Sequence, residues 1–90
     1  MITLKDAAKI LQKKEPKASF FGAFEYKELY VFHMFDGEVW TEGSSLDYYM
    51  SVNKETGEAK SFNDWKETFN NPEEYISAEK NTILANKFID

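Results

Sequence analysis

Two neighbouring segments of this chain are apolar at almost every position, and they constrain the fold more than any other feature. Residues 19–26 have the sequence SFFGAFEY and residues 29–35 have the sequence LYVFHMF, with only Lys27 and Glu28 between them. Aromatic and β-branched residues favour strands, and a short polar connection favours an antiparallel hairpin. Successive side chains of a strand point to opposite faces, so this hairpin is apolar on both faces. A strand with one face in water alternates apolar and polar residues instead, so we expect these strands at the centre of a sheet or against a partner.

Two further strands are predicted after this hairpin. Residues 46–53 place aromatic and aliphatic side chains on one face, as a half-buried strand does. Gly57 suits the tight turn that follows, and residues 58–62 form a short polar strand that is typical of a sheet edge. We therefore predict a four-stranded, mainly antiparallel sheet, with the irregular segment 38–45 as its longest loop.

The start of the chain predicts an amphipathic helix over residues 4–14. Thr3 followed by Asp6 resembles a capping box, and Pro16 is a residue that ends a helix. Between these signals the apolar residues recur at helical spacing and share one face. They are Leu4, Ala7, Ala8 and Leu11.

Two more helices are predicted near the C-terminus. The first is short and carries Trp65 and Phe69 four residues apart, on one side of the helix. The pair Asn71-Pro72 is a strong start for the second, because proline is favoured at the first helical position. Residues 79–90 either continue this helix or form a loosely packed helical tail. Consecutive strands with helices at both ends indicate a single α+β domain over the whole chain.

Strand alternation divides the apolar side chains into two sets. We expect both helical regions to cover the richer set, which contains Phe20, Phe24, Tyr30, Phe32, Met34, Tyr48 and Met50. The other set then stays partly exposed, and an exposed apolar face is typical of an interface. The alternative is that the loop 38–45 or the C-terminal tail covers this second set. The residues that we predict at the interface are Phe21, Val31, His33, Phe35, Trp40 and Tyr49.

Charge and composition argue against several classes of function. The net charge is −5, all 11 cationic side chains are lysines, and there is no arginine. Nucleic-acid binding needs clustered lysine and arginine, so we expect no nucleic-acid partner. The chain has no cysteine, which excludes disulfides and favours a reducing cytoplasm. No run of roughly 18 apolar residues is present, so we expect no membrane partner.

Candidate catalytic and metal-binding residues are few. His33 is the only histidine, and it lies mid-strand with no serine or cysteine nucleophile pattern nearby, so we expect a structural or interface role. Asp36, Glu38 and Glu42 carry oxygen ligands, but their spacing does not match a calcium-binding loop. We expect a solvated loop there. The prediction is therefore no enzyme, no metal and no cofactor.

A set of motifs in the second half of the chain resembles a known group of proteins. Residues 48–58 have the sequence YYMSVNKETGE, Phe62 follows, and residues 71–75 have the sequence NPEEY. This pattern resembles small uncharacterised proteins of phages and prophages of Gram-positive bacteria. Those proteins carry an aromatic pair, a Val-Asp/Asn-Lys-x-Thr-Gly turn and an Asp/Asn-Pro-Glu-x-aromatic helix start. Small bacterial immunity proteins share the strand–Lys-x-Thr-Gly–strand element and are the second resemblance. Neither group supplies catalytic residues.

These observations favour a non-enzymatic phage- or prophage-type protein that binds another protein or itself, for example as a homodimer. The resemblance implies a location in the bacterial cytoplasm or in association with a virion. The alternative is a small acidic immunity or inhibitor protein that neutralises a basic toxin or a DNA-binding protein.

Overall fold

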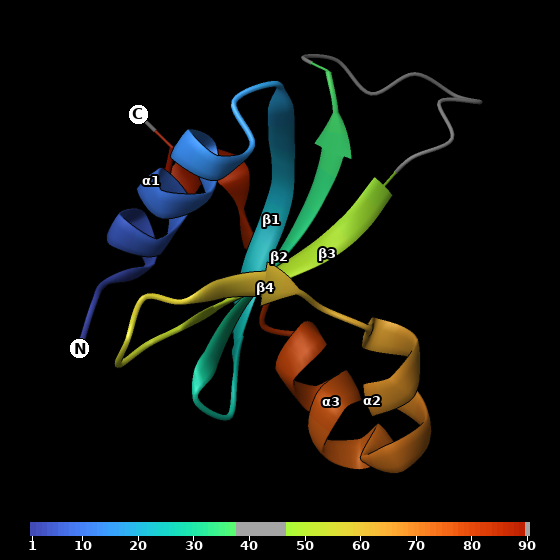
Figure 1. Ribbon diagram of the computed structural model, residues 1–90. Coiled ribbons are helices and arrows are strands. Elements are labelled where there is room, and N and C mark those ends of the chain that lie inside the picture. Colours follow the sequence, from blue (N-terminus) through green and yellow to red (C-terminus); the bar gives the residue numbers. More distant parts are fainter. Residues whose placement is uncertain (38–46, 90) are drawn as a thin grey trace.

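The computed structural model describes residues 1–37 and 47–89, which form a five-stranded antiparallel sheet with helices on both faces (Figure 1). The strands lie in the order β4-β3-β2-β1-β5, so both strands of the predicted hairpin have neighbours on either side. The elements are α1 (Leu4–Lys14), β1 (Ala18–Tyr26), β2 (Leu29–Asp36), β3 (Asp47–Asn53), β4 (Ala59–Ser61), α2 (Asp64–Asn70), α3 (Pro72–Glu79), β5 (Ile83–Leu84) and the 3₁₀ helix η1 (Ala85–Lys87). The α+β class and the helices at both ends are confirmed, whereas the predicted sheet was one strand short.

Helix α1 covers one face of the sheet because its sequence supplies both a cap and an apolar stripe. The Thr3 hydroxyl accepts a hydrogen bond from the Asp6 amide at 3.1 Å, and the Asp6 carboxylate accepts one from the Thr3 amide at 3.3 Å. These hydrogen bonds to Thr3 hold the pKa of Asp6 below its usual value. The helix packs into a cluster that we call the α1-face core: Ala7, Ala8, Leu11, Ala23, Tyr30, Phe32, Met34, Met50, Val52 and Phe88.

The opposite face of the sheet is covered by α3. Its one buried residue, Tyr75, lies 1% exposed against β1, with ring centroids 5.6 Å from Phe24 and 5.2 Å from Tyr26. With Val31 these residues form a second cluster, the α3-face core. The prediction that all helices share one face was therefore wrong, and Figure 1 shows α1 and the α2–α3 pair on opposite sides of the sheet.

An irregularity in β1 explains the error in assigning faces. Phe20 pairs with Met34, but the next pair is Gly22 with His33, so one residue of β1 is extra at this point. Such a bulge exchanges the two faces for every residue that follows it. As a result Phe24 lies in the α3-face core, not with Phe20, and Ala23 lies in the α1-face core.

The fifth strand comes from the tail of the chain. Residues 83 and 84 pair with Ala23 and Gly22 of β1, and η1 then returns the chain to the sheet. Phe88 is 4% exposed, and its ring lies 5.6 Å from Phe20 and 5.7 Å from Phe32. The last described residues thus complete the α1-face core. The polar run 79–82 gave no sign of this pairing.

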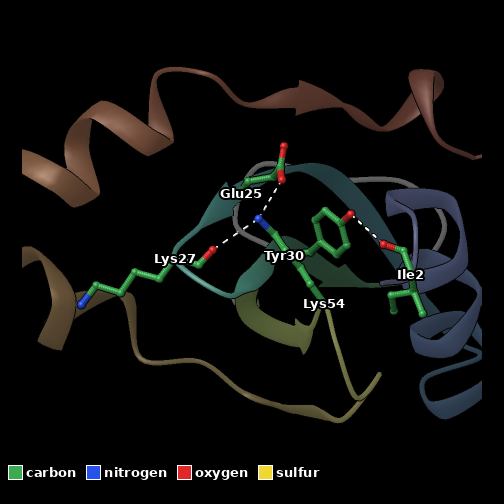
Figure 2. A network of polar contacts seen from close by, with 5 residues as sticks. All are labelled: Ile2, Glu25, Lys27, Tyr30 and Lys54. Atoms are coloured by element: carbon green, nitrogen blue, oxygen red, sulfur yellow. Dashed lines mark hydrogen bonds and ion pairs between the residues drawn. The ribbon is translucent and has the colours of Figure 1, made fainter.

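Lys54 ties three segments together at the end of the sheet near the N-terminus (Figure 2). Its ammonium group lies 2.7 Å from the Glu25 carboxylate, donates to the Lys27 carbonyl at 3.3 Å, and lies 5.4 Å from the centre of the Tyr30 ring. The Tyr30 hydroxyl in turn donates to the Ile2 carbonyl at 2.9 Å. These contacts fix the two hairpin turns and the start of α1 relative to one another.

Candidate functional site

Four of the six residues predicted at the interface form a continuous stack of rings on the α3 side of the sheet. The Phe21 ring lies 4.5 Å from both Phe35 and His33. His33 then stacks on Tyr49 at 4.5 Å with only 6° between the ring planes. Phe21 follows Phe20 directly and so lies on the opposite face, and the stack runs across β1, β2 and β3. The structure therefore brings these residues together on the α3 side, where Tyr49 packs against the α3-face core.

The predicted interface residues differ in how much surface they offer. Val31 is fully buried in the α3-face core and Phe35 is 7% exposed, so neither presents a surface to a partner. Phe21, His33 and Tyr49 are half-buried. Trp40 lies outside the described residues. Among the described residues, only these three members of the predicted set have surface that a partner can contact.

Asp47 holds the histidine of this stack. The His33 Nε2 donates to the Asp47 carboxylate over 2.7 Å, and this hydrogen bond is the main cause that lowers the pKa of Asp47. An ionised carboxylate at this position fixes the plane of the imidazole against Tyr49. The pair therefore orients a flat aromatic wall, and sequence reasoning did not identify Asp47.

Tyr49 is the centre of the site, because two hollows flank it. The larger has a volume of about 590 Å³ and is lined by Asp47, Tyr48, Tyr49, Ser61, Phe62, Asn63 and Asp64. The smaller has a volume of about 270 Å³ and is lined by Phe21, Gly22, Phe24, His33, Tyr49, Glu79, Thr82 and Leu84. Burial raises the pKa of Tyr49 to about 12, with further contributions from the negative charges of Asp64, Glu79 and Asp47. Aromatic walls in a negative field are suited to positively charged groups.

Helices α2 and α3 add an acidic surface with exposed aromatic rings. Their sequences contain five carboxylates against one lysine, a net charge of −4. Trp65 is 69% exposed and Phe69 is 68% exposed, and their rings contact each other at 4.6 Å. Helix α1 has four lysines against one aspartate, a net charge of +3, on the other side of the sheet. We call the surface of α2 and α3 the acidic hairpin.

Sequence reasoning missed the acidic hairpin as a functional surface, although its signals were present. Trp65 and Phe69 were recognised as one side of a short helix, which is a pattern that usually marks a buried stripe. In the structure, however, none of the residues of α2 is buried. The acidic residues around the pair are the signal that could have identified an exposed surface.

The described residues contain no group of three or more histidine, aspartate or glutamate side chains that could hold a metal ion. Asp36, of the predicted acidic loop, is exposed at the end of β2, and Glu38 and Glu42 lie outside the described residues. None of the helices in residues 1–37 and 47–89 is long and apolar enough to cross a lipid bilayer.

Comparisons with known proteins find no match to a family model, to a curated protein or to a solved structure. The chemistry of the Tyr49 site and of the acidic hairpin is therefore the ground for a functional assignment.

Proposed function

We propose that this protein is a non-enzymatic binding protein whose partner is a positively charged protein. The observation that carries the proposal is the acidic hairpin, where two exposed aromatic rings lie in a segment of net charge −4. Large exposed aromatic side chains are the residues that contribute most to protein–protein affinity. Carboxylates around them steer a basic partner toward the surface and suppress acidic competitors.

The position of the acidic hairpin supports the same function. Asp64 begins α2 and lines the larger hollow beside Tyr49, so the exposed helical pair and the Tyr49 site are joined through the start of α2. A partner that covers Trp65 and Phe69 therefore lies within reach of the aromatic stack. This arrangement favours an acidic inhibitor or immunity protein that binds a basic partner. It favours less a protein that binds through an exposed apolar sheet face alone.

Selection of binders from a random peptide library tests the proposal, because it requires no particular partner to be chosen in advance. We expect the enriched peptides to combine lysine or arginine with apolar residues. Their Kd should rise by about tenfold or more in a Trp65→Ser/Phe69→Ser variant, since hot-spot truncations have effects of this size. It should also rise between about 0.05 M and 0.5 M salt, because salt screens charge pairs.

Charge reversal supplies the matched control. Glu73→Lys/Glu74→Lys changes the acidic hairpin, and Lys5→Glu/Lys13→Glu makes the same number of changes on α1. The first variant should lose the basic peptides and the second should keep them. Enrichment of neutral or acidic peptides, or equal loss in both variants, would refute the proposal.

Self-association is the second candidate, and the separation of charge favours it. A basic α1 and an acidic hairpin on opposite sides of one sheet are complementary surfaces, so copies could join head to tail. Sedimentation at low salt should then show a mass that grows with concentration and returns to that of the monomer at high salt. A monomer at every concentration would exclude this candidate. Neither candidate depends on the phage or prophage origin that the resemblance implies.

A further inference from the structure

The smaller hollow beside Tyr49 lies where residues of four strands, β1, β2, β3 and β5, meet the end of α3. Its volume is about 270 Å³, and it is bordered by Glu79 of α3 and Thr82 of the turn that leads to β5. Gly22 forms part of the lining, at the point where the turn into β5 approaches β1 closely. Helix α3 ends at Glu79, and this residue forms one border of the hollow. Ligand pockets for whole small molecules usually measure at least about 300 Å³, so this volume suits a single side chain.

Half of the eight residues that line the hollow carry aromatic rings. Phe21, Phe24, His33 and Tyr49 all contribute to it, and the nearly parallel His33 and Tyr49 rings are held in place by Asp47. The face of an aromatic ring is electron-rich and attracts a cation. A guanidinium group is flat, stacks on such faces, and is more weakly hydrated than an ammonium group. The geometry therefore favours an arginine side chain over a lysine side chain.

The charges around the hollow also favour a positively charged side chain. The Glu79 carboxylate lies at its border, and no lysine is among its described lining residues. Asp47, Asp64 and Glu79 all raise the pKa of the Tyr49 hydroxyl through their negative charge, so their field reaches the aromatic wall. A guanidinium that enters the hollow can therefore pair with the Glu79 carboxylate at its border while it contacts the aromatic carbon atoms that line it.

We propose that this hollow receives one arginine side chain of the basic partner, with Tyr49 and Phe21 as the ring walls and Glu79 as the charge partner. The inference rests on the proposed function for the source of the arginine. The site itself can be tested without the partner.

Titration with N-acetyl-arginine amide, followed by NMR of the protein, tests the site directly. We expect shift changes centred on the residues that line the hollow, with a Kd on the order of 10 mM for a single cation–aromatic site. The lysine analogue should bind more weakly. The citrulline analogue has the same shape without the charge, and it should bind at least about fivefold more weakly. Equal binding of the citrulline and arginine analogues would overturn the inference, as would shift changes confined to other surfaces.

Variants separate the roles of the walls and of the carboxylate. Tyr49→Leu and Glu79→Gln should each weaken binding of the arginine analogue by at least about threefold, whereas Tyr49→Phe keeps the ring and should keep the affinity. If Tyr49→Leu fails to fold, Glu79→Gln and Tyr49→Phe still test the site, because Glu79 is exposed at the end of α3. Unchanged affinity in Glu79→Gln would remove the carboxylate from the proposal and so refute it as stated.

The Trp65→Ser/Phe69→Ser variant distinguishes this inference from the proposed function. It should lose the selected basic peptides but bind the arginine analogue as the unmodified protein does, because neither residue lines the hollow. Basic peptides that bind the acidic hairpin with no shift changes at the hollow would refute the arginine site and leave the function standing. If the arginine analogue binds but no basic peptide is selected, the arginine site stands and the proposed function is refuted.

Discussion

The helices that cover the two faces of the sheet differ in length and in how many side chains they bury. On one face, an 11-residue capped helix buries Ala7, Ala8 and Leu11, and Phe88 closes the same cluster from the end of the chain. On the other face, helices of 7 and 8 residues bury one side chain between them, Tyr75. The first cover leaves none of its large apolar side chains exposed. The second leaves Trp65, Phe69 and Ile76 in water.

The contrast shows that an apolar strand surface does not by itself determine where a binding surface forms. Both faces of β1 and β2 are apolar, yet the surface that remains open depends on the length and charge of the helix that packs there. An amphipathic helix of three turns buries its apolar stripe, whereas two short helices rich in carboxylates leave large aromatic rings exposed. The α1 face thus has the more complete cover, and the α3 face carries the surface that we propose binds a partner.

The largest expected effect compares a core residue of the first face with an exposed residue of the second. Leu11→Ala should lower the free energy of unfolding by about 3 kcal/mol, because Leu11 is fully buried and truncation leaves a cavity. Trp65→Ala should change it by at most about 0.5 kcal/mol, because the side chain is mainly solvated. Urea denaturation with the m-value checked for each variant measures both.

A large loss of stability in Trp65→Ala would break the contrast between the two faces, because Trp65 would then belong to the core. The same titration in Phe69→Ala serves as a control, since Phe69 has almost the same exposure and contacts the Trp65 ring.

Much of the fold could be predicted, because several local signals in the sequence are strong. Thr3, Asp6 and Pro16 defined both ends of α1 correctly, and Asn71-Pro72 marked the start of α3. The bulge in β1 could not be predicted. The bulge lies directly before Gly22, which also pairs with Leu84 of β5, a contact between distant parts of the chain. One extra residue then moved Phe24 and Tyr26 to the other face.

The candidate site could be predicted only in part for the same reason. Phe21, His33 and Tyr49 were placed on one face because Phe21 precedes the point where the register changes. The partners that give the site its chemistry come from elements distant in sequence: Asp47 at the start of β3, Asp64 at the start of α2 and Glu79 at the end of α3. Carboxylates at the ends of helices and strands are usually explained by capping, so their convergence on Tyr49 depends on the tertiary fold.

A smaller effect is expected at the point where the tail joins the sheet. A methyl group added at Gly22 would lie 2.8 Å from the Ile83 carbonyl oxygen and 2.8 Å from the Thr82 methyl carbon, so β5 must move away from β1. We expect Gly22→Ala to lower the free energy of unfolding by about 2 kcal/mol, which is typical of overpacking. The hydrogen-exchange protection of β5 should fall more than that of β2.

Gly37→Ala is the matched control for this substitution. Gly37 has φ +92°, and apart from its chain neighbours no atom of the described residues lies within 4 Å of an added Cβ, so we expect a cost limited to backbone strain of about 1 kcal/mol. An equal loss in both variants, with β5 still protected in Gly22→Ala, would show that the tail does not depend on the close approach at Gly22.

The smallest effects separate two tyrosines of the α3-face core that differ in their hydroxyl groups. The Tyr26 hydroxyl donates to the Glu67 carboxylate at 2.8 Å, whereas the Tyr75 hydroxyl is buried and has no hydrogen-bond partner among the described residues. Tyr26→Phe should therefore cost about 1 kcal/mol, and Tyr75→Phe should be neutral or stabilise by up to about 1 kcal/mol, because a buried polar group without a partner is unfavourable. Thermal and urea unfolding near neutral pH, where both phenols are protonated, give the comparison. If Tyr75→Phe destabilised the protein as much as Tyr26→Phe, the Tyr75 hydroxyl would have to make a stabilising hydrogen bond. The contrast between the two faces would then be smaller, because the α3 face would hold no buried polar group without a partner.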